Sequence, residues 1–231
     1  MLIVLKTNME YEYCRKNLIV VGDSFCAGQG WPQELAELLN LNLVVAGYGG
    51  HPWWACRHFL HQEEIKDKIA ETDTLVFVHT FAERIPFDCP NEQIANINKF
   101  DPNPKTEVGL AVKLYYKYLE NAPFAEWAQQ KWFEEINKDY ANLKTVHLHG
   151  FPSSLPFRNL LGGVQVLPDL TSISIAEIYK DGAHPNTLHQ DTRPNHFSTE
   201  NNSVIANQLC KLITDYSPGD HEFNLDHFQL T

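Results

Sequence analysis

A serine stands directly after a short apolar run in the segment Gly22-Asp23-Ser24-Phe25. A serine hydroxyl is a weak nucleophile unless a base within hydrogen-bond distance takes its proton. The preceding glycine allows a tight exit from a strand, and the amides of such a turn can face a developing oxyanion. The same residues can also merely shape a turn. Their types and spacing make Ser24 a candidate nucleophile that needs partners elsewhere in the chain.

A glycine-rich stretch, Ala46-Gly47-Tyr48-Gly49-Gly50, follows the next apolar run. Glycines let a backbone amide come close to a ligand. The amide of Gly50 could therefore act beside the Ser24 amide as a second oxyanion donor. For Gly47 alone, a left-handed turn after the strand is the favoured interpretation.

A histidine close to the last helical pattern supplies a candidate base. The segment runs Asp191-Thr192-Arg193-Pro194-Asn195-His196-Phe197-Ser198, and Ser198 is of the residue type that caps a helix N-terminus. Histidine suits general-base work because its ordinary pKa lies near neutral pH. A carboxylate commonly orients such an imidazole. We therefore expect His196 to take the Ser24 proton and a carboxylate to orient the ring.

Together these segments resemble the SGNH (GDSL-like) hydrolase family, from about Asn17 to about Leu212. Gly22-Asp23-Ser24-Phe25 is similar to the family's nucleophile block. Gly47-Tyr48-Gly49-Gly50 is similar to its second block, whose oxyanion glycine maps to Gly50. The segment that begins Asn195-His196 looks like the block that carries the catalytic histidine and opens the final helix. The resemblance implies a three-layer α/β/α, flavodoxin-like fold with a five-stranded parallel sheet. It also implies ester hydrolysis or acyl transfer through an acyl-serine, with no cofactor and no metal. The implied substrates are esters of lipids, acetylated sugars and other small acyl esters.

The sequence departs from the family pattern at two places. The third block normally offers an asparagine to the oxyanion hole, but here it reads His79-Thr80-Phe81-Ala82-Glu83-Arg84, where the Thr80 hydroxyl could donate instead. The family's aspartate position, three residues before the histidine, is Arg193. A rival segment, Asp181-Gly182-Ala183-His184, keeps the family spacing but runs into Pro185 rather than a helix. We therefore favour His196 as the base and leave Asp191 and Asp181 open as the acid.

Apolar runs alternate with helical patterns along the chain, which predicts βαβ units and one parallel sheet in a single domain over residues 1–231. Strands are predicted over 17–21, 43–45, 74–79, 145–148 and 163–167, and helices over 31–40, 53–70, 106–120, 123–140 and 198–215. The site should lie beyond the carboxyl ends of the strands. Residues of about 86–140 are expected to form a mostly helical insert, which could act as a lid or could equally be helical packing with no role in the chemistry. Residues 217–231 are expected to form a polar surface tail.

Composition narrows the possible partners and location. The formal net charge is −11, which disfavours binding to nucleic acid. The five cysteines are scattered without a CxxC pair, and no signal peptide or membrane-spanning run is apparent, so reduced thiols and a cytoplasmic location are expected. Cys26 could be a second nucleophile, although a small buried residue is the favoured interpretation.

Two other functions stay open. His147 and His149 would share one face of a strand and could bind a metal together with His184, His189 or His196, although a polar rim is the favoured interpretation. The chain could also be a binding module that kept the fold and lost efficient catalysis. Tryptophans that could line a sugar or acyl pocket, but more often pack in a core, are Trp53, Trp54, Trp127 and Trp132.

Overall fold

The computed structural model describes residues 16–26, 30–47, 51–70, 72–84, 107–173 and 197–229. Its centre is a six-stranded sheet in the order β2-β1-β3-β4-β5-β6, in which every neighbouring pair is parallel. The strands are β1 (Asn17–Gly22), β2 (Asn42–Gly47), β3 (Thr72–His79), β4 (Lys144–His149), β5 (Val164–Leu167) and β6 (Gly219–Glu222). The expected parallel sheet is confirmed, with six strands rather than five.

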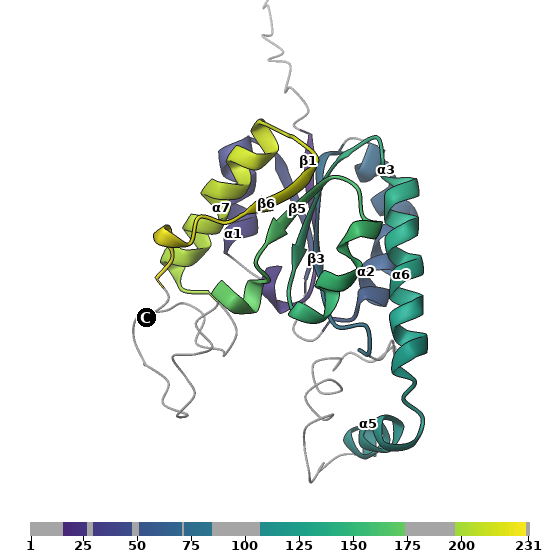
Figure 1. Ribbon diagram of the computed structural model, residues 1–231. Coiled ribbons are helices and arrows are strands. Elements are labelled where there is room, and N and C mark those ends of the chain that lie inside the picture. The colour runs from purple at the N-terminus through teal and green to yellow at the C-terminus, as the bar shows by residue number, and fades with distance from the viewer. Residues whose placement is uncertain are drawn as a thin grey trace, which may run out of the picture.

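Helices cover both faces of this sheet, as Figure 1 shows. One face carries α1 (Trp31–Leu39) and α7 (Thr199–Thr214), and the other carries α2 (Trp53–Leu60), α3 (Glu63–Ala70) and α6 (Ala122–Asp139). The expected three-layer α/β/α arrangement is thus confirmed. Helix α5 (Glu107–Tyr118) stands apart, beyond the edge where the strands end (Figure 1). None of the described helices combines the length and apolarity needed to cross a bilayer.

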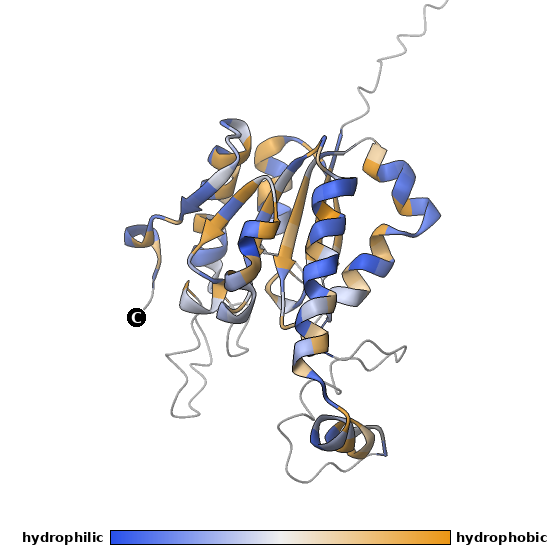
Figure 2. Cartoon of the chain, turned by 45° about the vertical axis from the view of Figure 1, so that its right-hand side comes forward, coloured by the Kyte–Doolittle hydropathy of each residue, from blue (hydrophilic) through white to orange (hydrophobic). Residues whose placement is uncertain are grey.

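The apolar runs form strands because the sheet is buried on both faces. In β1, Leu18 and Val20 pack in the core beneath α1 and α7, whereas Ile19 and Val21 pack in the core beneath α2, α3 and α6. A parallel strand covered on both sides needs apolar residues at every position rather than at alternate ones. Figure 2 shows the result, with hydrophobic strands enclosed by helices whose outward faces are hydrophilic.

The helix predicted over residues 53–70 is two helices. The end of α2 tightens as the Gln62 amide donates to the Phe59 carbonyl oxygen, and the Gln62 carbonyl oxygen then accepts from the Ile65 and Lys66 amides of α3. Helix α3 opens with Glu63 and Glu64, which favour a helix N-terminus because they oppose its dipole. The apolar periodicity runs through both helices and gives no sign of the break.

The segment after α7 contributes to the core. Strand β6 pairs with β5, and the Phe223 amide donates to the Leu167 carbonyl oxygen at 2.7 Å. Phe223 and Phe228 are buried, and their rings meet edge to face. The expectation of a polar surface tail over 217–231 therefore does not hold for these two residues. Since β6 itself reads Gly-Asp-His-Glu, its sequence carries no strand pattern.

Candidate active site

Ser24 lies on a tight turn at the carboxyl end of β1. The turn is a short 3-10 helix, Ser24–Cys26, and it is closed by Asp23. The Asp23 carboxylate accepts from the Phe25 amide at 3.0 Å, and its carbonyl oxygen accepts from the Cys26 amide at 3.2 Å. Asp23, Phe25 and Cys26 are buried, while Ser24 is half-buried. The turn therefore holds its own backbone firmly and leaves the serine partly accessible.

Two glycines allow this turn to sit against the sheet. A Cβ atom added to Gly47 would lie 2.5 Å from the Cys26 sulfur and 2.9 Å from the Asp23 carbonyl oxygen. A Cβ added to Gly22 would lie 2.5 Å from the Cβ of Val78. Gly47 does not have a left-handed backbone, so the turn interpretation of this residue is wrong. Close approach of the nucleophile turn is what excludes a side chain there.

Cys26 is fully buried beneath the turn, and its thiol donates to the Asp23 carbonyl oxygen at 3.3 Å. Burial, and secondarily the Asp23 charge, raises the pKa of Cys26 well above its ordinary value. A thiol attacks only as a thiolate. The interpretation of Cys26 as a small buried residue is confirmed, and its raised pKa disfavours the thiolate that a second nucleophile would need.

Thr80 follows the last residue of β3, the strand next to β1 in the sheet. Its backbone is held by a residue of α6, because the Gln129 side-chain amide donates to the Thr80 carbonyl oxygen at 2.8 Å. Its side chain is buried, and within the part of the chain that the structure describes its Oγ1 has no hydrogen-bond partner. An unpaired buried hydroxyl costs stability, and among the described residues the Thr80 hydroxyl keeps its donor unused.

Arg84 brings a positive charge to the carboxyl ends of the strands, where Asp23 lies. Its Nη1 donates to the Asp23 carboxylate and to the His51 carbonyl oxygen, at 2.9 Å each. Its guanidinium lies over the rings of Phe81 and Phe151. Sequence reasoning missed this residue, because a lone arginine after a strand follows no spacing rule that would link it to Asp23.

The start of α7 meets the nucleophile turn. The Phe197 ring lies 5.4 Å from the Phe25 ring, measured between centroids. The Ser198 hydroxyl accepts from the Asn201 amide at 3.1 Å, so the predicted N-cap is confirmed. Four predicted site residues lie outside the described part of the chain, namely Gly50, Asp181, Asp191 and His196.

Helix α1 ties the same two segments together. The Trp31 indole donates to the Phe25 carbonyl oxygen at 2.8 Å, while the Trp31 amide donates to the Asn202 side chain at 2.9 Å. The Asn202 amide group in turn donates to the Ser198 carbonyl oxygen at 2.9 Å. This series of hydrogen bonds runs from the Ser24 turn to the first turn of α7 and fixes their relative position.

The histidines of β4 face the same side of the sheet, as predicted, but they are buried rather than part of a rim. His147 bonds the ring of His79 at 3.0 Å, and His149 bonds Ser154 at 2.9 Å and Gln165 at 3.2 Å. Burial lowers the pKa of His147 to about 3 and that of His149 to about 4. They are therefore neutral internal groups bonded to neighbouring side chains.

Among the described residues, one group has the geometry to hold a metal ion, namely His61, Glu135 and Asp139. The Glu135 carboxylate is already bonded by both Nε and Nη2 of Arg57, at 2.7 and 2.8 Å. His147 and His149 do not belong to this group. Two further histidines of the metal alternative, His184 and His189, lie outside the described residues.

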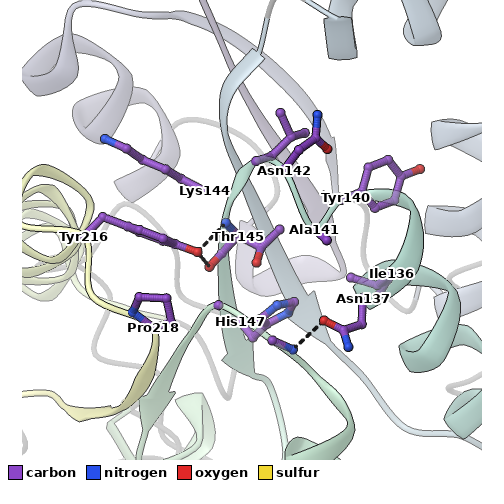
Figure 3. Close-up of a pocket in the computed structure, with 13 residues that line it drawn as sticks. Ile136, Asn137, Tyr140, Ala141, Asn142, Lys144, Thr145, His147, Tyr216 and Pro218 are labelled. Atoms are coloured by element: carbon purple, nitrogen blue, oxygen red, sulfur yellow. Dashed lines mark hydrogen bonds between the residues drawn. The ribbon is translucent and has the colours of Figure 1, made fainter.

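A cavity of about 380 Å³ lies at the opposite edge of the sheet, at the amino ends of β4 and β5. Its lining includes Tyr140, Thr145, His147 and Tyr216, and in Figure 3 the Tyr216 hydroxyl is bonded to the backbone of Thr145. Neither Ser24 nor Thr80 lines it. The cavity is therefore separate from the candidate active site.

The tryptophans do not share one environment. Trp132 is buried in the core under α6, and the Trp53 indole donates to the Ala82 carbonyl oxygen at 3.3 Å. Trp54 and Trp127 are 44% and 52% exposed. The core interpretation thus holds for Trp132, and these side chains do not form a common pocket wall.

No protein-family profile matches the sequence, and no curated protein matches it. Among solved structures, the chain is similar to a lipase/acylhydrolase from Enterococcus faecalis, at 11% identity and a TM-score of 0.43, over 89% of this chain and 100% of that chain. It is similar to the lipase Lip_vut3 from a goat rumen metagenome, at 16% identity and a TM-score of 0.42, over 84% and 95% of the two chains. It is also similar to a proposed SGNH hydrolase from Slackia heliotrinireducens, at 14% identity and a TM-score of 0.32, over 85% and 98%. These identities and TM-scores are too low to carry an argument about activity, which rests on the residues of the site.

Proposed function

We propose that this chain is a serine hydrolase that cleaves carboxylic esters. Ser24 is the nucleophile, His196 is its base, and Asp191 or Asp181 orients the histidine. The amides of Ser24 and Gly50 and the hydroxyl of Thr80 stabilise the oxyanion. The substrate class is a small ester, such as an acetylated sugar or a lipid ester.

One observation carries the proposal. Phe25, which follows Ser24 in sequence, packs against Phe197, which follows His196 in sequence. The contact is reinforced through Trp31 and Asn202, which join the nucleophile turn to the start of α7. A nucleophile and its base must come within hydrogen-bond reach, and this packing favours that arrangement for Ser24 and His196.

The chemistry follows from these roles. The Ser24 oxygen attacks the ester carbonyl carbon while His196 takes the hydroxyl proton, which gives a tetrahedral oxyanion. The ester C–O bond then breaks, and the alcohol leaves with the proton from His196. Water attacks the acyl-serine with His196 again as base, and the carboxylic acid leaves as Ser24 is restored. Neutral Cys26 does not compete for the acyl group, because burial raises its pKa.

The experiment is hydrolysis of a short-chain chromogenic ester by wild type, Ser24→Ala and His196→Ala, each with and without a chelator. We expect wild-type turnover to survive the chelator and both variants to lose at least about 1,000-fold in kcat, as triad removal does elsewhere. His184→Ala, expected to keep activity, separates the two histidine assignments. Asp191→Asn and Asp181→Asn identify the acid by whichever loses turnover.

The outcomes separate the competing functions. Activity that is unchanged in Ser24→Ala would contradict the serine mechanism. Activity that the chelator abolishes would favour a metal hydrolase. A wild type that hydrolyses none of a series of acetyl, butyryl and longer-chain esters would favour the binding module.

A further inference from the structure

Arg84 joins the loops that follow β1, β2 and β3. It lies in the loop after β3, and the two hydrogen bonds of its Nη1 reach Asp23 in the nucleophile turn and His51 in the loop after β2. His51 directly follows Gly50, the proposed second oxyanion donor. One guanidinium nitrogen therefore ties together the segments that carry the proposed nucleophile and this donor.

The link to the nucleophile turn is charged and buried. Asp23 is fully buried, and the Arg84 side chain is 11% exposed. A buried carboxylate is costly unless it is paired and hydrogen-bonded, and both oxygens of Asp23 are used. Oδ2 accepts from Arg84 and Oδ1 accepts from the amide of Phe25. The position of Arg84 is thus transmitted through Asp23 to the amide next to Ser24.

Arg84 is itself held in place by aromatic rings. Its guanidinium carbon lies 5.7 Å from the centroid of Phe81 and 5.3 Å from that of Phe151. These two rings stack on each other at 3.9 Å, and Phe151 also meets the edge of Phe25 at 5.6 Å. A planar guanidinium on aromatic faces loses little freedom when it donates its hydrogen bonds. The arginine is therefore a fixed point for all three loops.

We propose that Arg84 is a positioning residue of the active site, which holds the Ser24 turn in register with the loop that carries Gly50. This inference rests on the proposed function. It assigns no contact between Arg84 and substrate, because Arg84 acts through Asp23 and the His51 carbonyl. Loss of Arg84 should therefore slow turnover while substrate binding changes little.

The kinetic test compares Arg84→Met and Arg84→Lys with the matched control Arg57→Met. Arg57 also forms a partly buried ion pair, with Glu135 between α2 and α6, and the interactions of its side chain in the described structure are with Glu135 and the Trp54 ring. We expect Arg84→Met to lower kcat by about 100-fold, the cost of a small misplacement of catalytic groups, with KM within about threefold. Arg84→Lys should regain part of that loss, and Arg57→Met should match wild type. A loss confined to KM, or a loss equal to that of Arg57→Met, would overturn the proposal.

A second readout does not depend on activity. We expect hydrogen exchange at the amides of residues 23–26 to be faster in Arg84→Met than in wild type and Arg57→Met, because Asp23 loses the partner that fixes its carboxylate. Unchanged exchange would overturn the positioning role. If wild type hydrolyses no ester, the proposed function fails, and the exchange rates alone decide whether Arg84 holds the turn.

A paired variant covers the case in which Arg84→Met does not fold. Asp23→Asn combined with Arg84→Met leaves no unpaired buried charge and keeps an acceptor for the Phe25 amide. We expect this variant to fold and to lose at least about tenfold in kcat, because the link to His51 is still absent. Wild-type turnover in a folded double variant would overturn the proposal.

Discussion

At the scale of single residues, Asp23 and Thr80 show two different states of a buried polar group. The Asp23 carboxylate is satisfied on both oxygens, whereas the Thr80 hydroxyl has no partner among the described residues. A satisfied buried group stabilises one geometry, while an unsatisfied one costs free energy. The described structure thus keeps the Ser24 turn well bonded and leaves the Thr80 hydroxyl as an unused donor at the neighbouring strand end.

Thr80→Val tests whether that donor serves catalysis. Valine has the shape of threonine without the hydroxyl, so the free energy of unfolding should rise by about 1 kcal/mol. If Thr80 donates to the oxyanion, kcat should fall by about 100-fold at the same time. Urea unfolding and ester hydrolysis measure the two effects.

Thr74→Val is the matched control, because Thr74 lies on β3, the strand that ends just before Thr80, and it is buried with an equally unpaired hydroxyl in the described structure. It should gain similar stability and keep wild-type turnover. Full activity in Thr80→Val would remove Thr80 from the oxyanion hole.

At the scale of elements, β3 and β4 place three histidines side by side under α6. The His79 and His147 rings stack at 5.2 Å, and the ring of His149 lies 5.4 Å from that of His79. Burial is the largest cause that lowers the pKa of each of these histidines, and it lowers the pKa of His79 well below 6.5. The core face of these two strands therefore depends on imidazoles that stay uncharged.

These histidines should make the protein lose stability in mild acid. Below about pH 6.5 the unfolded chain binds protons on them while the folded chain does not, until the pH approaches about 4 for His149 and about 3 for His147. The free energy of unfolding should then fall by about 1.4 kcal/mol per pH unit for each histidine. Urea unfolding at pH 6.5 and pH 5 measures this slope.

His147→Gln should reduce that slope by about 1.4 kcal/mol per pH unit, the contribution of one histidine. His58→Gln, a change at an exposed histidine, should leave the slope unchanged. Equal slopes in wild type and His147→Gln would mean that other groups cause the acid sensitivity.

Much of the element order was predictable from the sequence. The strands β1 and β3 carry the unbroken apolar runs Leu18–Val21 and Leu75–Val78, as a strand buried on both faces requires. The polar strand β6 was not predictable, because its place is set by pairing with β5 and by Phe223 and Phe228 beside it. Arg84 was missed for a related reason, since its partners are distant in sequence and meet only when the three strand ends align.

At the scale of the whole molecule, the segment after α7 closes the core between that helix and the sheet. Phe223 is 4% exposed and belongs to this core, and the Asn201 side chain exchanges two hydrogen bonds with the backbone of Gln229. These contacts join the last described residues to the first turn of α7. The segment is thus part of the folded unit.

Phe223→Ala should lower the free energy of unfolding by about 3 kcal/mol, through lost burial and the cavity left behind. Leu225→Ala, at a neighbouring residue that is 42% exposed, should cost less than about 1 kcal/mol. Chemical unfolding of the two variants measures the difference, and equal losses would argue against a core role for Phe223.

The order of the strands also bears on how the chain is made. After β3, each further strand joins the outer edge in turn, as β4, β5 and then β6. The helix α7, which covers Val146, Leu148, Val164 and Val166, is synthesised after all four of these residues. While the ribosome is still translating that stretch, this side of the nascent sheet has α1 but lacks α7, and exposed apolar surface promotes aggregation. We therefore expect the nascent chain to be most prone to aggregation between the synthesis of β4 and the completion of α7.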